Sequence, residues 1–135
     1  MKILIDTNII LDVLCNRKDY LDDSLRVFRY CEANLVTGYI SAVSIPNIVY
    51  IMRKELNSSR IKEILTTLTS IFTVADLRKT DLIRAAELEF SDYEDALQSV
   101  CALRVKADYI VTRNTKDFKN SPVPAITPSE LFVKL

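Results

Sequence analysis

The sequence predicts an α/β protein in which helices cover both faces of a parallel sheet. Short apolar runs alternate with amphipathic stretches along all 135 residues, which is the pattern of repeated strand–helix units. The first run, residues 2–5, is apolar without interruption from Ile3 and stops at Asp6, as a buried parallel strand would. The length suits one domain over residues 1–135, since domains usually have about 100–150 residues.

The remaining elements follow from β-branched runs and from apolar positions three or four residues apart. We expect strands over residues 36–40, 72–75, 109–112 and 125–127. We expect helices directly after Asp6 and over residues 20–33, 41–52, 58–70, 79–90, 91–105 and 128–134. Pro46 and Pro128 fit these helices because proline is tolerated in a first turn. Residues 113–120 form a polar loop between the last two strands.

Composition excludes several classes of enzyme. The chain has no histidine, so Ser-His-Asp triads and His-ligated zinc are impossible. Gly38 is the only glycine, which rules out a phosphate-binding P-loop and a dinucleotide fingerprint. Lys plus Arg and Asp plus Glu both number 18, so nucleic acid could bind only at a local basic patch. No apolar run approaches the roughly 20 residues of a membrane helix, and a cytoplasmic location is the default expectation.

Polar residues that directly follow strands are the first candidates for a functional site. In open parallel sheets, ligands bind beyond the carboxyl ends of the strands, where the strand order reverses. Two such segments occur here, residues 6–8 after the first strand and residues 112–114 after a late strand. Asp6 is the sharpest signal, although an aspartate at this point could equally cap the helix that follows.

Further acids lie near the start of the helix over 91–105 and in the polar loop. Asp92 and Asp95 are three residues apart and share one helical face. Asp92 is best explained as the helix cap, whereas Asp95 is placed to face a cleft. Asp117 lies in the loop, where an aspartate commonly forms a turn at the surface.

These acids suit a hard divalent cation. Mg²⁺ and Mn²⁺ prefer carboxylate oxygens, and Asp6, Asp95 and Asp117 would repel one another unless a cation neutralised them. Such a site can activate water and stabilise charge on a phosphodiester under in-line attack. Without histidine, proton transfer would fall to metal-bound water and carboxylates.

Four segments together resemble the PIN-domain nucleases, a family that includes VapC-like toxins of toxin–antitoxin pairs. They are ILIDTNIILD over residues 3–12, SAVSIPNIVY over 41–50, DYEDALQ over 92–98 and ADYIVTRNTKDF over 107–118. Each segment alone is weak evidence, but their order and spacing cover nearly the whole chain. The resemblance implies a three-layer α/β/α fold with a central parallel sheet of four to five strands. It also implies an endoribonuclease that depends on Mg²⁺ or Mn²⁺, a homodimer, an RNA substrate and an antitoxin partner.

The resemblance also assigns roles by position. Asp6, Asp95 and Asp117 become the catalytic, metal-binding acids. The supporting polar residues are Thr7, Asn8, Asn47, Asp92, Thr112 and Asn114. Arg113 and Lys116 are placed to contact RNA phosphates, which would make binding sensitive to salt.

Two positions depart from the family pattern. Asn47 stands where many members carry a glutamate, and Asn114 where many carry an aspartate. A neutral amide binds a cation less strongly than a carboxylate does, although Asp117, Asp92 or Glu94 could substitute. The alternative is therefore a weakly active or inactive PIN-fold module that binds RNA or a protein partner.

Two other uses of a strand-end aspartate fit the sequence poorly. A phospho-acceptor domain needs a cluster of acids at that strand end and a lysine after a late strand, but Thr112 is followed by Arg113. A hydrolase with an aspartate nucleophile would need an Asp-x-Asp motif, and the residue two positions after Asp6 is Asn8.

Overall fold

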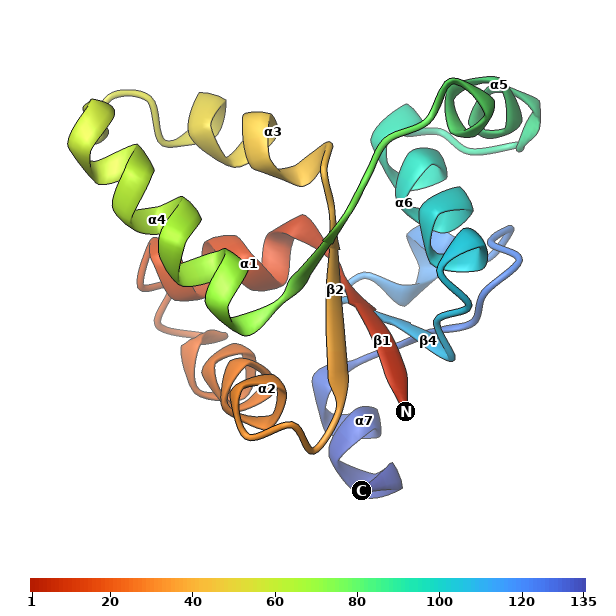
Figure 1. Ribbon diagram of the computed structural model, residues 1–135. Helices are drawn as coiled ribbons and strands as arrows, with labels where there is room; N and C mark the ends of the chain where they lie inside the picture. The colour runs from red at the N-terminus through yellow and green to blue at the C-terminus, as the bar shows by residue number, and fades with distance from the viewer.

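A five-stranded parallel sheet forms the centre of the computed structural model, which describes residues 1–135 (Figure 1). The strands are β1 (Lys2–Ile5), β2 (Thr37–Ser41), β3 (Thr73–Ala75), β4 (Tyr109–Val111) and β5 (Ala125–Ile126). Their order across the sheet is β3-β2-β1-β4-β5, and every pairing is parallel. The order therefore reverses at β1, which pairs with β2 on one side and β4 on the other.

Helices cover both faces of the sheet. They are α1 (Thr7–Leu14), α2 (Leu21–Glu32), α3 (Ser44–Ile51), α4 (Ser58–Ile71), α5 (Lys79–Glu87), α6 (Tyr93–Arg104) and α7 (Pro128–Lys134), with a short 3₁₀ helix η1 (Thr115–Phe118). In Figure 1, α1 to α4 lie on one side of the sheet and α5 and α6 on the other. The predicted α/β/α architecture with four to five parallel strands is thus confirmed.

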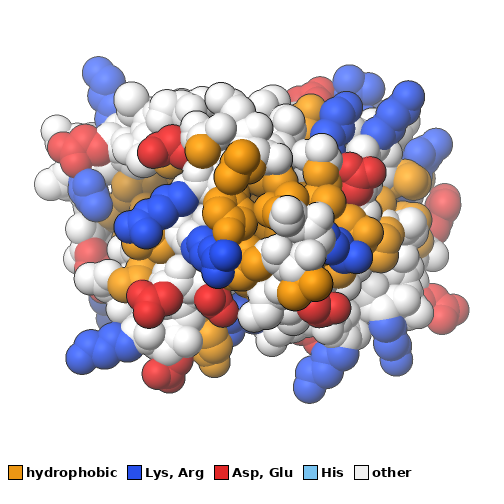
Figure 2. Space-filling view, turned by 90° about the horizontal axis from the view of Figure 1, so that it is seen from below, with side chains coloured by type: hydrophobic (Ala, Val, Ile, Leu, Met, Phe, Trp, Pro, Cys, Tyr) orange, Lys and Arg blue, Asp and Glu red, His pale blue; other side chains and the backbone are white.

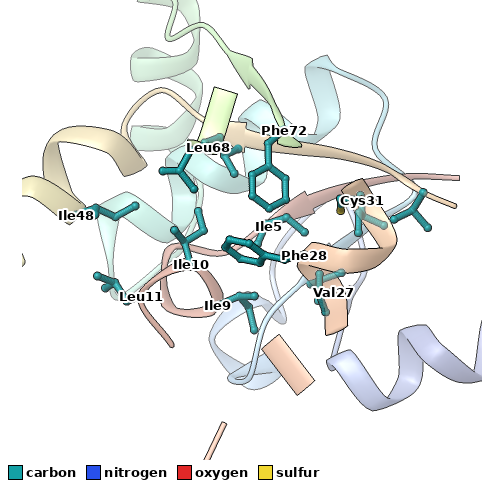
Figure 3. Close-up of a cluster of buried hydrophobic side chains, with 14 of the residues drawn as sticks. Ile5, Ile9, Ile10, Leu11, Val27, Phe28, Cys31, Ile48, Leu68 and Phe72 are labelled. Atoms are coloured by element: carbon teal, nitrogen blue, oxygen red, sulfur yellow. The ribbon is translucent and has the colours of Figure 1, made fainter. Parts of the chain in front are cut away.

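The central strand supplies the two cores from alternate residues. Ile3 and Ile5 belong to the larger core, whereas Leu4 belongs to a smaller core on the α6 side. All three side chains are fully buried, which explains why this strand is a continuous apolar run. Figure 3 shows the larger core around Ile5, where the rings of Phe28 and Phe72 meet edge to face at a centroid distance of 4.9 Å.

The only glycine of the chain, Gly38 on β2, lies directly against the side chain of Cys31 on α2. A Cβ atom on Gly38 would lie 2.6 Å from Cys31 Sγ and 2.8 Å from Phe72 Cδ1. Both distances are shorter than van der Waals contact, and both neighbours are buried in the core. Packing, rather than a turn conformation, therefore requires glycine at this position.

Several elements differ from the sequence expectation, and α3, expected from residue 41, begins only at Ser44, because Ser41 belongs to β2. β2 is shifted by one residue, because Ser41 rather than Val36 takes part in the ladder with β3. α5 ends at Glu87, since Leu88 adopts an extended backbone and Phe90 turns toward Phe118. Part of the polar loop forms η1 and is anchored by Phe118, which is 3 % exposed.

The two ends of the parallel strands face different parts of the molecule. Figure 2 views the end of the sheet where β1 begins, near the chain ends, and apolar side chains gather in the middle of this face with basic and acidic side chains scattered around them. The opposite end receives the carboxyl ends of the strands and is the one next to α3 and the start of α6 (Figure 1). No helix of the structure is long and apolar enough to cross a membrane.

Candidate active site

Asp6 is the buried centre of the candidate site. It directly follows β1, and its backbone N–H donates to Val111 O at 3.0 Å, which ties the end of β1 to the end of β4. Its carboxylate accepts hydrogen bonds from Gln98 Nε2 at 3.0 Å and from Thr112 Oγ1 at 2.8 Å. Asp6 makes no side-chain capping bond to α1, so the capping explanation is wrong. The carboxylate turns instead toward α6 and the segment after β4.

Burial dominates the electrostatics of Asp6. The residue is 4 % exposed, and this desolvation raises the pKa of its carboxyl. The hydrogen bonds from Thr112 and Gln98 act in the opposite direction, because they favour the ionised form. No lysine or arginine forms an ion pair with Asp6, although the charge of Arg113 acts on it and also favours its ionised form.

Glu94 lies beside Asp6 and connects three helices. Its Oε1 accepts a hydrogen bond from Thr7 Oγ1 at 2.9 Å, and Thr7 Oγ1 is 2.7 Å from Ser44 Oγ. Its Oε2 accepts a short hydrogen bond from Asn47 Nδ2 on α3. Desolvation raises the pKa of Glu94, and Asp92 and Asp6 contribute in the same direction. Thr7 and Asn47, which were expected to support the site, thus donate hydrogen bonds to Glu94. The side chain of Asn8 makes no hydrogen bond.

The two aspartates at the start of α6 have different surroundings. Asp92 caps the helix, because its Oδ1 accepts from the Asp95 N–H at 3.1 Å. Asp95 is half-buried in the first turn and has no ion-pair partner. Burial raises the pKa of Asp95 to about 7, and the charges of Asp92, Asp6, Asp117 and Glu94 add to the effect. Asp95 therefore lies in an acidic environment that no basic side chain offsets.

The segment after β4 closes the site. Thr112 is fully buried and accepts the Asn114 N–H at 3.1 Å, so one hydroxyl joins the loop to Asp6. Asp117 lies in η1 with an exposed side chain, and its negative charge contributes to the raised pKa of Asp95. Lys116 is exposed on the same short helix.

The residues suit a hard cation by chemistry and by charge. Their side chains offer only oxygen ligands, and carboxylates near one another without basic partners favour a divalent cation. No group of three or more acidic or cysteine side chains is drawn close enough to hold a metal ion by itself. The charges of buried Asp6 and exposed Asp117 both act on Asp95.

Arg113 points away from these acids. Its Nε and Nη2 donate to Asp12 at 2.9 and 3.1 Å, and its guanidinium carbon lies 3.7 Å from the centroid of the Tyr20 ring. Asp12 is fully buried and also accepts from Ser24 Oγ at 2.9 Å and Arg17 Nη1 at 3.4 Å. The charge of Arg113 is therefore already compensated by Asp12, so Arg113 is less suited than Lys116 to contact RNA phosphates. Both contacts stay predictions.

Sequence reasoning did not single out three residues that shape the site. Gln98 lies three residues after Asp95, is 1 % exposed, and leaves its Oε1 buried without a hydrogen-bond partner. Ser44 bonds Thr7 from the start of α3. Asp12 holds the arginine next to Thr112. All three are polar residues at helix positions that face the protein interior, and such a position is the signal by which the sequence could have indicated them.

Comparisons with known proteins agree with this architecture. The sequence profile of the PIN domain matches residues 2–116. Ribonuclease VapC1 from Aquifex aeolicus (strain VF5) is 28% identical over 133 residues, which cover 96% of this chain and 92% of that protein. The crystal structure of VapBC2 from Rickettsia felis bound to a promoter DNA fragment contains a chain with a similar fold, with a TM-score of 0.71, 20% identity, and coverage of 94% of this chain and 98% of that one.

A toxin–antitoxin complex from Klebsiella pneumoniae also contains a chain with this fold. Its TM-score is 0.68 at 24% identity, covering 93% of this chain and 96% of that one. At these identities the solved structures establish the fold alone. The profile match, which spans most of the chain and all four sequence segments but for two residues of the last, establishes the family. This chain belongs to the PIN domain family.

Proposed function

We propose that the protein is an endoribonuclease that depends on Mg²⁺ or Mn²⁺ and is the toxin of a toxin–antitoxin pair. One observation carries the catalytic part: Asp6 is buried where β1 ends, Glu94 and Asp95 are half-buried at the start of α6, and no basic side chain forms an ion pair with any of them. A cation-dependent phosphodiesterase needs such uncompensated oxygen ligands. Asp6, Asp95 and Asp117 are the acids proposed to hold the cation.

The residues around the acids have roles that follow from their contacts. Thr112 and Gln98 fix both oxygens of Asp6 and favour its ionised form against the effect of burial. Asp92 fixes the first turn of α6 and thereby the position of Asp95. The Thr112 hydroxyl also holds Asn114, so the loop that carries Asp117 is connected to Asp6 through one side chain. A bound cation would supply an activated water and neutralise charge that develops on the phosphate.

RNA as substrate and an antitoxin as partner are supported by the named relatives. One relative is called a ribonuclease, and similar folds occur in solved toxin–antitoxin complexes. Lys116 is proposed to meet an RNA phosphate from η1, where it is exposed next to Asp117. A homodimer is part of the same proposal.

Cleavage of a mixed RNA panel with Mg²⁺, Mn²⁺ or EDTA tests this function. The Asp6→Asn variant should lose at least about 100-fold in cleavage rate, and EDTA should abolish cleavage by the wild type. Asp22→Asn removes an equal charge from an exposed position on α2 and should leave the rate unchanged.

Unchanged cleavage in EDTA would refute the metal dependence, and unchanged cleavage by Asp6→Asn would refute the site. Absence of cleavage by the folded wild-type protein, purified free of any inhibitor, would favour a module that binds RNA or a protein without turnover.

A further inference from the structure

We propose that the cavity between η1 and the connection from α5 to α6 binds one unpaired base of the RNA substrate, beside the acidic site. The inference rests on the proposed ribonuclease function and adds a substrate contact outside its acids. This cavity, the base pocket, is formed by residues 89–91 and by Lys116, Asp117, Lys119 and Asn120. Its volume of about 290 Å³ lies at the lower end of the range for small-ligand sites, roughly 300–1,000 Å³, and suits a single base.

Phe90 supplies an aromatic surface in the base pocket. Its ring packs edge to face against Phe118 at a centroid distance of 6.2 Å, and Phe118 is buried. This contact fixes the orientation of Phe90, whose side chain is half-buried and lines the pocket with its remaining surface. Proteins commonly hold unpaired RNA bases by stacking them on an aromatic side chain, and every base has a face for such a contact.

Polar groups of the base pocket are available to the edge of a stacked base. Asn120 Nδ2 donates to Glu89 O at 2.7 Å, which joins the two walls of the pocket and fixes the amide. Asn120 Oδ1 and the Ser91 hydroxyl form no hydrogen bond within the protein, and both residues are exposed. Because an amide oxygen accepts and a hydroxyl either donates or accepts, both groups can bond to a base.

The charges of the base pocket fit a neutral base with a phosphate on either side. Lys116 and Lys119 balance Glu89 and Asp117, so the lining has no net formal charge. Neither lysine forms an ion pair and both are exposed, which leaves them free to meet phosphates. Since η1 contacts α6 and the charge of Asp117 acts on Asp95, one RNA strand can reach both the acids and the pocket.

The cavity beside Tyr20 is less suited to RNA, although its volume of about 220 Å³ is similar. Its one basic side chain, Arg113, is already bound to Asp12. Asp19 and Asp23 line the same cavity and would repel a phosphate. The combination of an aromatic ring with unpaired lysines therefore favours the base pocket.

Binding of a labelled single-stranded RNA of about ten nucleotides, measured by fluorescence anisotropy in EDTA, tests the base pocket without cleavage by the proposed activity. Phe90→Leu keeps an apolar contact with Phe118 but removes the stacking surface, so it should weaken binding by about 10-fold. A strand of the same length that lacks its bases should bind equally to the wild type and to Phe90→Leu, because it has nothing to stack.

Phe132→Leu is the matched control and should bind RNA as the wild type does. Phe132 is also half-buried and packs edge to face on another ring, that of Tyr30, but it lies on α7 near the chain ends (Figure 1). Lys119→Gln should reduce the slope of log affinity against log salt concentration by about 0.7, the value for one phosphate of a single strand. Asn120→Ala changes an exposed residue, should weaken binding by about 3-fold, and carries the test if Phe90→Leu does not fold.

The outcomes separate the base pocket from the proposed function. If Phe90→Leu and Asn120→Ala bind RNA as tightly as a wild type that cleaves it in Mg²⁺, the pocket is refuted and the ribonuclease stands. If Phe132→Leu loses as much affinity as Phe90→Leu, or if the strand without bases is affected as strongly as the RNA, general packing explains the loss and the pocket is again refuted. If Phe90→Leu alone weakens RNA binding but the wild type cleaves with no cation, the pocket stands and the ribonuclease falls.

Discussion

Two buried aspartates six residues apart in the chain have opposite electrostatic environments. Asp6 is 4 % exposed, the side chains that donate to its carboxylate, Gln98 and Thr112, are neutral, and it forms no ion pair. Asp12 is fully buried and is bound by two arginines, Arg113 and Arg17, as well as by a serine. The same residue type at similar burial is thus compensated by basic partners at one position and left without them at the other.

The difference indicates that Asp12 serves the stability of the fold, whereas Asp6 serves the chemistry of the site. Removing one partner of a buried ion pair leaves an unpaired charge and is strongly destabilising. A buried acid among other acids disfavours folding while it is ionised, because burial and like charges both oppose the ionised form. We therefore expect the Asp12 region to maintain the fold and the Asp6 region to bind a cation at some expense of stability.

The largest expected effect contrasts the two aspartates directly. Asp12→Asn should lower the free energy of unfolding by about 3 kcal/mol, because it leaves the partly buried guanidinium of Arg113 without its anion. Asp6→Asn should change it by less than about 1 kcal/mol, since Thr112 can still donate to the new amide oxygen and Gln98 can turn its unpaired Oε1 toward the new amide nitrogen. Urea denaturation of both variants measures the difference.

Equal losses in the two variants would contradict the comparison, because they would mean that Asp6 contributes to the fold as much as Asp12 does. The exposed Asp22→Asn variant gives the baseline for removing one negative charge from the protein.

A smaller effect concerns pH and is specific to the acidic region. Without a divalent cation, stability should fall as pH rises from about 4 to 7, because folded Asp95 keeps its proton up to a pKa of about 7 while the unfolded carboxyl, with an ordinary value of 3.8, has lost it. Since Asp95 is partly exposed and its charge is screened, the loss should be about 1–2 kcal/mol rather than the full value of the shift. The Tm measured across this range should show it.

Asp95→Asn removes this group and should make the profile less steep between about pH 4 and 7, while Asp6 and Glu94, whose pKa values are also raised, should retain part of the slope. Added Mn²⁺ should also flatten it in the wild type, because the cation stabilises the ionised carboxylates. A profile that stays steep in Asp95→Asn would assign the pH dependence to another group.

The ion pairs of Asp12 with Arg113 and Arg17 can be weakened without removing a charge. Arg113→Lys keeps the cation but loses the two-point contact with Asp12 and the stacking on Tyr20, so it should lower the free energy of unfolding by about 1–2 kcal/mol. Arg17→Lys should change it by less than about 0.5 kcal/mol, because Arg17 reaches Asp12 through a single contact of 3.4 Å and is 35% exposed. If the two variants are equal, the geometry of Arg113 is not what stabilises this loop.

The strands and Asp6 could be predicted because their signals are local. A continuous apolar run marks β1, and the reversal of strand order at β1 brings the residues after β1 and β4 together. The same local reasoning identified Asp92 as the cap of α6, which its bond to the Asp95 N–H confirms. It left capping open for Asp6, because only the contacts with Gln98 and Thr112, far along the chain, decide the direction of that side chain.

The partners of the charged side chains could not be predicted, since they depend on packing between distant segments. Arg113 was expected to meet RNA, yet Asp12 binds it from α1, 101 residues earlier in the chain. Asn47 suggested a missing acid on α3, but its amide reaches Glu94 on α6. Both contacts cross between elements that no spacing rule connects.

The smallest expected effect comes from adding an acid near Asp6 and Asp95, which have no basic ion-pair partner. Asn114 is half-buried, and its N–H donates to Thr112, the residue that also binds Asp6. Asn114→Asp should raise the affinity for Mn²⁺ by about 3- to 10-fold, because affinity for a hard cation grows with the number of charged ligands. It should also lower the stability measured without cation, by up to about 1 kcal/mol, through repulsion from the existing acids.

Thr67→Asp adds the same charge on the exposed face of α4 and should change neither quantity beyond error. Titration calorimetry and the Tm with and without Mn²⁺ measure both effects on one sample. The two effects must appear together, because the repulsion that destabilises the cation-free protein is what the cation relieves. An affinity gain without a loss of stability would mean that residue 114 contacts the cation but lies too far from the other acids to be repelled by them. A loss of stability without an affinity gain would mean that residue 114 lies near the other acids but does not contact the cation.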